Sequence, residues 1–320
     1  MFLPLSDAPN PRGVPWVTYL LIAASVGVYL MVSLPLSLQR ASPDDPALRE
    51  YLEIMAPRLP AEVSVQALSQ QTSRYDLFVF EHGYRPAAPS IADLFASMFL
   101  HGGLLHLLGN MLFLWIYGDN VEYRLGRLGY LLAYLGTGVA ATLFFALFAS
   151  GSHVPMVGAS GAISGVLGFY FLWFPRNVVR VYVFLFPLMM DVVEVSARIV
   201  LGFYLVVDNL LPFLMSRGGA GGGVAHGAHL GGFVAGLGAA FLLDRLNLLG
   251  RPREYRERRR PAAAAETPEE APLDALVEQG RFAEASRRYF APRPASARLL
   301  LSPRSSLALA DWLARSSRGR

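Results

Sequence analysis

Ser160 and His229 are far apart in the sequence, but together they have the side chains that nucleophilic catalysis requires. A serine hydroxyl does not lose its proton near neutral pH unless a base accepts it, and a neutral imidazole is a suitable base. Gly158 and Gly161 flank the serine, allow close backbone approach and leave its hydroxyl unobstructed. The pair predicts serine hydrolase chemistry if the fold brings the two side chains together.

A second polar pair, His106 and Asn110, is spaced four residues apart and therefore lies on one helix face. The segment that begins at Gly158 predicts a helix whose first N–H groups are free and whose dipole is positive at that end. His106, Asn110 and the backbone N–H of Ser160 are thus predicted to form an oxyanion hole. The other histidines are expected to be interfacial or hydrogen-bonding residues: His82, His101, His153 and His226.

Glycines recur near both candidate catalytic residues, at Gly161, Gly165 and Gly168 and again at Gly232 and Gly236. Small residues let membrane helices approach closely, so these glycines also have a purely structural interpretation. If the two glycine faces pack together, the serine and the histidine can meet.

The sequence places no acidic residue where it would clearly orient His229. Asp208 and Glu194 lie in or beside an apolar segment, but no spacing fixes either of them near the imidazole. We therefore expect a Ser–His dyad rather than a triad.

The composition of the 320-residue chain is that of a membrane protein. Hydrophobic residues make up 53% and charged residues only 16%, against about 25% charged in soluble domains, and mean hydropathy is +0.38. The chain has no cysteine, which excludes disulfides and thiolate metal sites. The net charge of +4 comes with arginines clustered at the ends of apolar runs, so no nucleic-acid partner is expected. The N-terminus does not resemble a cleavable signal.

Six apolar segments predict an all-α polytopic membrane protein, because long apolar runs without strand alternation span lipid as helices. The fourth segment has about 17 residues, or roughly 25 Å of helix, and is shorter than the ~30 Å hydrocarbon core. We expect its serine to lie in a recessed, water-accessible pocket. An apolar run at 181–190 is expected at the membrane interface. The segments are 14–36, 97–121, 128–149, 158–174, 193–214 and 223–249.

The arginine distribution predicts the orientation of the segments. The loop 43–93 is acidic and is expected outside, whereas arginines follow the second, fourth and sixth segments. Segments two, four and six then enter the bilayer from the outer side. The predicted organisation is a cytoplasmic tail at 1–13, a membrane domain at 14–250 with an outer loop at about 38–95, an Arg/Ala/Pro-rich linker at 251–272, and an amphipathic helical cytoplasmic tail at 273–320.

Three motifs together resemble the rhomboid family. FLHGGLLHLLGN at 99–110 is similar to the family's HxxxxHxxxN segment, GASG at 158–161 to its GxSG motif, and AHLGG at 228–232 to its AHxxG motif. Glu122 and Gly126 resemble a further acidic-and-glycine pattern of the family. The order and spacing agree over about residues 14–250.

The resemblance implies an intramembrane serine protease that cleaves single-pass transmembrane substrates near their outer ends. Ser160 would be the nucleophile and His229 the base, with His106, Asn110 and the Ser160 N–H as the oxyanion hole. Substrate access would involve the region 195–222, where the glycine-rich run 218–223 would give mobility. No cofactor or metal is expected, a bacterial inner membrane is the expected location, and the oligomeric state is left open. Two alternatives also stay open: a catalytically silent rhomboid-like protein that binds membrane clients, and a His-lined metal transporter.

Overall fold

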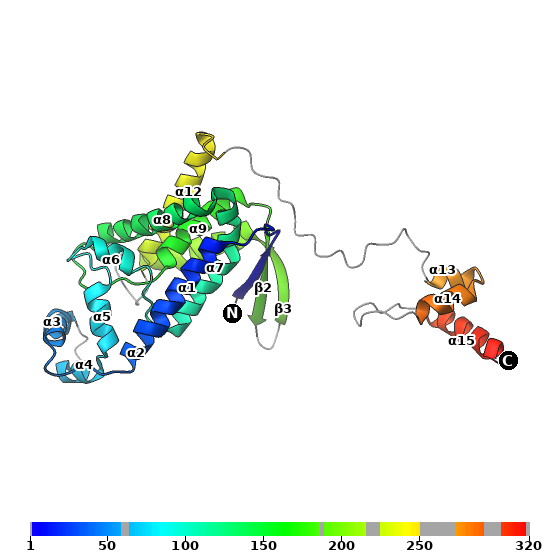
Figure 1. Cartoon of the computed structure of the whole chain (residues 1–320), viewed down its shortest axis with the longest axis horizontal. Helices are drawn as coiled ribbons and strands as arrows, with labels where there is room; N and C mark the ends of the chain where they lie inside the picture. Colours follow the sequence, from blue (N-terminus) through cyan, green and yellow to red (C-terminus); the bar gives the residue numbers. More distant parts are fainter. Residues whose placement is uncertain are drawn as a thin grey trace. The chain divides into compact units, whose positions relative to one another are not determined.

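The computed structural model is mostly helical and describes residues 2–58, 64–185, 189–215, 225–249, 273–290 and 302–317. The chain divides into two compact units, Met1–Arg258 and Arg259–Arg320 (Figure 1). The elements of the first unit, in chain order, are β1 Phe2–Ala8, α1 Trp16–Val28, η1 Tyr29–Ser33, α2 Leu34–Ser37, α3 Pro46–Met55, η2 Ala56–Arg58, α4 Val65–Gln71, α5 Arg74–His82, α6 Ile91–Ala96, α7 Leu104–Leu125, α8 Arg127–Phe148, α9 Ser160–Trp173, β2 Val178–Leu185, β3 Met189–Ser196, α10 Ala197–Leu205, η3 Val206–Leu210, α11 Leu211–Met215 and α12 His226–Arg245.

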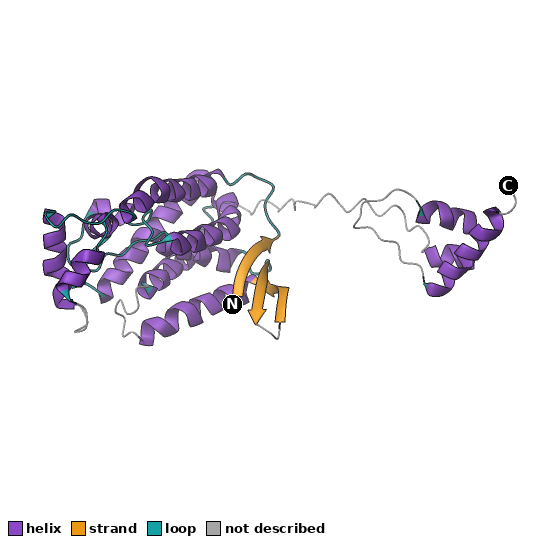
Figure 2. Ribbon diagram, turned by 90° about the horizontal axis from the view of Figure 1, so that it is seen from below, coloured by secondary structure: helices purple, strands orange, loops and turns teal. Residues whose placement is uncertain are grey.

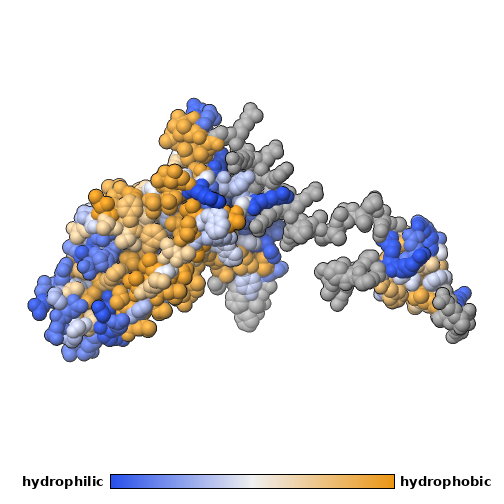
Figure 3. Space-filling model, viewed as in Figure 1, coloured by the Kyte–Doolittle hydropathy of each residue, from blue (hydrophilic) through white to orange (hydrophobic). Residues whose placement is uncertain are grey.

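Long apolar helices dominate the first unit. Four helical segments in the described part of the chain are long and apolar enough to cross a membrane: Trp16–Ser37, Arg127–Phe148, Ala197–Met215 and His226–Arg245. The second and fourth predicted segments correspond to α7, with 22 residues, and α9, with 14. The face of the first unit seen in Figure 3 is mostly apolar over the long helices and hydrophilic around α3 and α5.

Two predicted boundaries need correction. The second helix begins at Leu104 rather than at 97, because two consecutive glycines, Gly102 and Gly103, disfavour helix directly before it. The fifth segment, expected within 193–214, is the span Ala197–Met215, so it extends one residue past the expected range, and the residues before Ala197 belong to strand β3. The predicted mobile run at 218–223 and the predicted linker at 251–272 lie outside the described residues.

Helices α7, α9 and α12 run in the same direction, as the orientation argument requires. Asp244 near the end of α12 accepts hydrogen bonds from Arg124 at 2.8 Å and from the indole Nε1 of Trp173 at 2.9 Å. The guanidinium of Arg124 also lies 4.4 Å from the ring centroid of Trp173. The last turns of the three helices therefore meet at one carboxylate, and their first turns lie at the opposite end of the bundle.

A three-stranded antiparallel sheet, ordered β1-β2-β3, corrects the prediction of a purely α-helical protein (Figure 2). The described residues of the run at 181–190, which is predicted to lie along the membrane, belong to the antiparallel strands β2 and β3. The predicted tail at 1–13 contains β1, in which Phe2 pairs with Val183 and Ala8 with Val178. Alternating β-branched residues explain the hairpin, since Val179, Val181 and Val183 face the core.

Asp7 joins this sheet to the helical bundle through a buried hydrogen-bond cluster. Its carboxylate accepts from Asn10 at 3.1 Å, from Asn120 of α7 at 2.8 Å and from the hydroxyl of Tyr170 in α9 at 2.5 Å. Asn10 also donates to Asp119 at 3.1 Å. Only 6% of Asp7 is exposed, and desolvation raises its pKa to about 6 despite the donors around it.

Replacing Asp7 by asparagine is expected to change how stability depends on pH. Because burial raises its pKa from 3.8 to about 6, the stability contributed by protonated Asp7 is fully present below pH 3.8 and is lost as the pH rises through 6. Relative to Asp7→Asn, the wild-type free energy of unfolding should fall by about 3 kcal/mol at most between acidic and neutral pH. Unfolding both proteins in detergent at pH 4 and pH 7 measures this. A difference between them that is independent of pH would contradict the assignment.

Glu122 and Gly126, both predicted as motif residues, organise the junction of three helices. The carboxylate of Glu122 accepts from the backbone N–H groups of Val17 and Thr18 at 3.0 and 2.8 Å and from the Thr18 hydroxyl at 2.8 Å. It therefore caps the first turn of α1, where a negative charge also complements the helix dipole. Gly126 separates α7 from α8 with a φ of +73°, a conformation that favours glycine.

The described residues of the second unit form three helices, α13 Leu273–Glu278, α14 Phe282–Tyr289 and α15 Pro303–Ser317. The sequence predicts only an amphipathic helical tail here. The structure shows a small core, in which α15 contributes Leu309 and the ring of Trp312 stacks on Phe282 with centroids 6.0 Å apart. The buried residues of this core are Leu273, Leu276, Val277, Ala285 and Leu309.

Candidate active site

Ser160 is the first residue of α9, where the sequence analysis places it. Gly158 just before it has a φ of +125°, and a Cβ there would lie 2.8 Å from Cε1 of the His106 imidazole. A side chain at 158 would thus be strained and would displace the histidine. The glycine lets the loop before α9 pass directly against His106.

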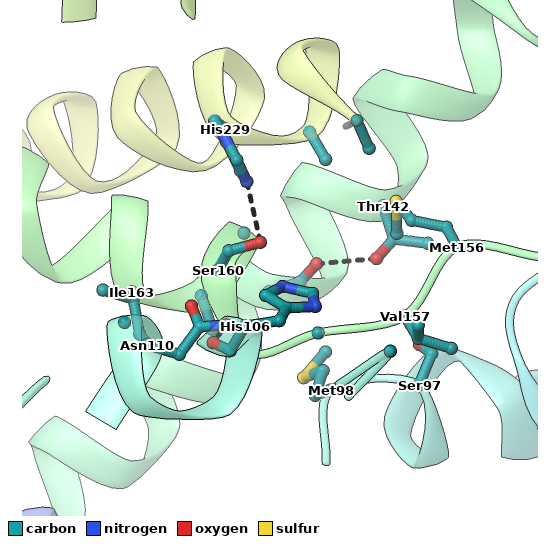
Figure 4. A pocket seen from close by; sticks show the side chains of 18 of the residues that line it. Ser97, Met98, His106, Asn110, Thr142, Met156, Val157, Ser160, Ile163 and His229 are labelled. Atoms are coloured by element: carbon teal, nitrogen blue, oxygen red, sulfur yellow. Dashed lines mark hydrogen bonds between the residues drawn. The ribbon is translucent and has the colours of Figure 1, made fainter. Parts of the chain in front are cut away.

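The structure brings Ser160 and His229 together. The Ser160 Oγ lies 2.7 Å from Nε2 of His229, which projects from the first turn of α12 (Figure 4). The two residues are 69 positions apart in the sequence and come from different helices. A hydroxyl and an imidazole at this distance can exchange a proton.

His106 and Asn110 project into the same cavity as Ser160 (Figure 4). Asn110 donates one amide hydrogen to the carbonyl oxygen of His106 at 3.0 Å, which leaves its second amide hydrogen for a ligand. Both side chains come from the first two turns of α7, as the four-residue spacing predicts. The donor-rich side of the cavity lies beside the serine hydroxyl.

The cavity itself has a volume of about 900 Å³, which is within the range of ligand-binding clefts. Polar groups of Ser160, His229, His106 and Asn110 converge in it, and Phe113 and Phe145 contribute apolar surface. Water is a required reactant of hydrolysis, and a cavity of this size has room for it.

Glycine packing between α9 and α12 explains why the serine and the histidine meet. A methyl group at Gly232 would overlap the carbonyl oxygen of Gly161, and one at Gly236 would overlap the carbonyl oxygen of Gly165. Gly168 approaches the carbonyl oxygen of Phe233 in the same way. The close packing that these glycines allow between α9 and α12 is therefore also what brings the serine and the histidine together.

A second hydrogen-bond partner of His229 was missed in the sequence. Asn209 in η3 places its Oδ1 2.6 Å from Nδ1 of His229, so the imidazole is contacted on both nitrogens. The expected Ser–His dyad stays a prediction, and Asn209 is an additional uncharged neighbour of the imidazole. Of the two acidic residues considered, Asp208 is exposed and Glu194 pairs with Arg180 across the sheet. The available signal was an uncharged polar residue inside an apolar segment, which requires a partner.

The remaining histidines do not join the site as reacting groups. His101 is fully buried, and its carbonyl oxygen accepts a hydrogen bond from the hydroxyl of Tyr75 in α5 at 2.8 Å. His226 lies one turn from His229, with ring centroids 6.4 Å apart. In the described part of the chain no three His, Asp or Glu side chains are grouped so that they could hold a metal ion.

Replacing Asn110 by alanine is expected to lower turnover by about 10²-fold, because one oxyanion donor is removed while two remain. The free energy of unfolding should fall much less, by about 1 kcal/mol, since a single hydrogen bond to the His106 carbonyl is lost. Substrate cleavage rates and thermal unfolding in detergent measure the two effects separately. Equal loss of fold and activity would indicate a structural residue.

Comparison with known proteins places these residues in a known domain. A family model described as the rhomboid domain matches residues 88–245. This range contains Ser160, His229, His106 and Asn110.

Curated relatives agree with that match. Rhomboid protein 1, mitochondrial, from Saccharomyces cerevisiae is 33% identical over 99 residues, which cover 30% of this chain and 29% of the relative. Rhomboid-like protein 11, chloroplastic, from Arabidopsis thaliana is 30% identical over 167 residues, covering 49% and 54%. Rhomboid protease GluP from Bacillus subtilis is 31% identical over 150 residues, covering 47% and 25%. The chain thus spans about half or less of each relative's length. Residues 88–245 are a rhomboid domain, and the chain belongs to the rhomboid family.

Proposed function

We propose that this protein is an intramembrane serine endopeptidase that hydrolyses peptide bonds of single-pass transmembrane proteins. The observation that carries the proposal is the 2.7 Å contact between Ser160 Oγ and His229 Nε2 inside a polar cavity. The rhomboid family consists generally of such proteases, and one relative is named a rhomboid protease.

The proposed reaction uses four residues of this chain. His229 accepts the proton of Ser160 while Oγ attacks the substrate carbonyl carbon. His106, Asn110 and the Ser160 N–H donate to the negative oxygen of the tetrahedral intermediate. Protonated His229 then donates its proton to the leaving amine, which leaves the acyl group bound to Ser160. In the second half of the reaction His229 accepts a proton from water, the water oxygen attacks the acyl carbon, and the bond to Ser160 breaks as Oγ regains its proton.

The proposed setting is a lipid bilayer crossed by six helices, with both termini in the cytoplasm. The meeting of the last turns of α7, α9 and α12 at Asp244 supports a common direction for these three helices. Helix α9 has 14 residues, about 21 Å, so its serine would lie below the outer surface of a ~30 Å hydrocarbon core. The relatives include mitochondrial, chloroplast and bacterial proteins, so a bacterial inner membrane stays a prediction.

Cleavage of a model transmembrane substrate by the purified protein in liposomes tests the proposal. We expect products cut near the outer end of the substrate's span, formed equally with and without a metal chelator. Binding of the substrate without cleavage would favour a silent client-binding protein. Transport of divalent metal ions, or activity abolished by chelation, would favour the His-lined transporter.

A further inference from the structure

Asn209 lies against the imidazole of His229 from a third helical segment. Only 1% of Asn209 is exposed, and its side chain makes two hydrogen bonds. Its Nδ2 donates to the carbonyl oxygen of Tyr204 at 2.8 Å, and its Oδ1 lies 2.6 Å from Nδ1 of His229. A buried amide with both ends paired has a defined orientation.

That orientation determines which ring nitrogen carries the proton. A flipped amide would place Nδ2 hydrogens against the imidazole and the oxygen of Asn209 against the Tyr204 carbonyl oxygen, which is repulsive. An amide oxygen can only accept, so Nδ1 of His229 must donate and carries the hydrogen. The lone pair of Nε2 then faces the Ser160 hydroxyl at 2.7 Å, which is the state a general base requires.

The opposite tautomer would oppose catalysis. With the hydrogen on Nε2, the imidazole could not accept the Ser160 proton, and the Nδ1 lone pair would face the lone pairs of the Asn209 oxygen. The Asn209 amide therefore lowers the free energy of the Nδ1–H tautomer, in which it accepts a hydrogen bond, relative to the Nε2–H tautomer, in which the two lone pairs repel each other.

A widened helical turn gives Asn209 this position. η3 is a π-helical turn between α10 and α11, in which the N–H of Leu211 bonds the carbonyl of Val206. Such turns are frequent at functional sites, because they turn a side chain away from the regular helix face. Asp208 beside it is exposed, whereas Asn209 is buried against α12.

The same segment also contacts the serine helix. The Tyr204 hydroxyl lies 3.0 Å from the Ser164 hydroxyl of α9. One segment, 197–215, thus contacts both helices that carry the reacting pair, although it is the least buried of the four candidate spans. The packing of this segment and the state of the imidazole are therefore linked.

We propose that Asn209 is a positioning residue that holds His229 in the tautomer whose Nε2 accepts the Ser160 proton. The inference rests on the proposed protease function, and it assigns the amide an effect on kcat rather than on substrate binding.

Three variants measured side by side test it. Asn209→Ala is expected to lower kcat by about 10- to 100-fold, the cost of misplacing a reacting group, with KM changed less than about twofold because the amide does not touch substrate. Asn209→Asp keeps an acceptor for Nδ1–H, and its kcat should be at least about tenfold higher than that of Asn209→Ala. It should do so although it is no more stable than Asn209→Ala, because a buried carboxylate replaces the donor to Tyr204. Asp208→Asn, on the same turn, is the matched control and should keep wild-type kinetics.

A readout that does not need activity separates failure of this inference from failure of the protease function. In ¹⁵N-histidine NMR, the His229 ring, identified by its loss in His229→Ala, should be the Nδ1–H tautomer in wild type and a mixture in Asn209→Ala. An inactive wild-type protein with these spectra would contradict the protease function and uphold the positioning role. Wild-type kcat in Asn209→Ala, an unchanged tautomer, or activity that follows thermal stability across all variants would overturn the inference.

Discussion

Substrate cleavage is expected to fall by about 10⁴-fold or more, below detection, when either Ser160 or His229 is replaced by alanine. Ser160→Ala removes the atom that attacks, and His229→Ala removes the base that makes the attack possible. Because the two residues act as one unit through their 2.7 Å contact, the double variant should be no less active than either single variant.

The folded state should survive these changes, which makes the loss interpretable. Ser160→Ala leaves a methyl group at a helix start where Gly158 and Gly161 provide space, and thermal unfolding in detergent should change little. His226→Ala is the matched control for His229→Ala, because His226 is a second histidine one turn away on α12, whereas His229 makes the hydrogen bond to Ser160. Cleavage that persists in Ser160→Ala would remove the basis of the proposed mechanism.

Gly236→Ala is expected to destabilise the protein by about 3 kcal/mol and to reduce activity with it. The added methyl would overlap the carbonyl oxygen of Gly165, so α9 and α12 must separate where their backbones touch. Since Ser160 and His229 lie on these two helices, their separation also increases the distance across which the proton moves. Thermal unfolding and cleavage rates measure both consequences.

Gly238→Ala offers a matched control on the same helix. Gly238 is exposed, and a Cβ at this position would meet nothing within 4 Å. Alanine is preferred over glycine within helices by about 1 kcal/mol in water, so this variant should be neutral or slightly more stable. Equal effects at 236 and 238 would show that helix propensity, rather than close packing of α9 against α12, determines stability here.

The reacting pair could be predicted from the sequence because its signals are local. Ser160 stands between glycines, His229 precedes a glycine stripe, and His106 and Asn110 share a helix face by spacing alone. The structure places all four side chains at one cavity. Their catalytic roles stay predictions until activity is measured.

Asn209 and the sheet could not be predicted in the same way, because each depends on a non-local feature. Asn209 faces His229 only through the widened turn η3, which apolar periodicity does not reveal. The sequence analysis places the apolar run at 181–190 along the membrane, because the strand β1 that pairs with β2 lies at least 170 residues away in the sequence. Asp7 in that partner strand becomes a buried cluster residue only when the N-terminus returns to α7 and α9.

Covalent labelling with a serine-directed fluorophosphonate probe, followed by identification of the modified peptide, tests the central claim most directly. The reagent reacts only with a serine whose proton can be removed and whose surroundings stabilise the negative charge that forms. The account predicts one modified residue, Ser160, in wild type and no labelling in His229→Ala. Labelling at another serine, or labelling of Ser160 that does not depend on His229, would contradict it.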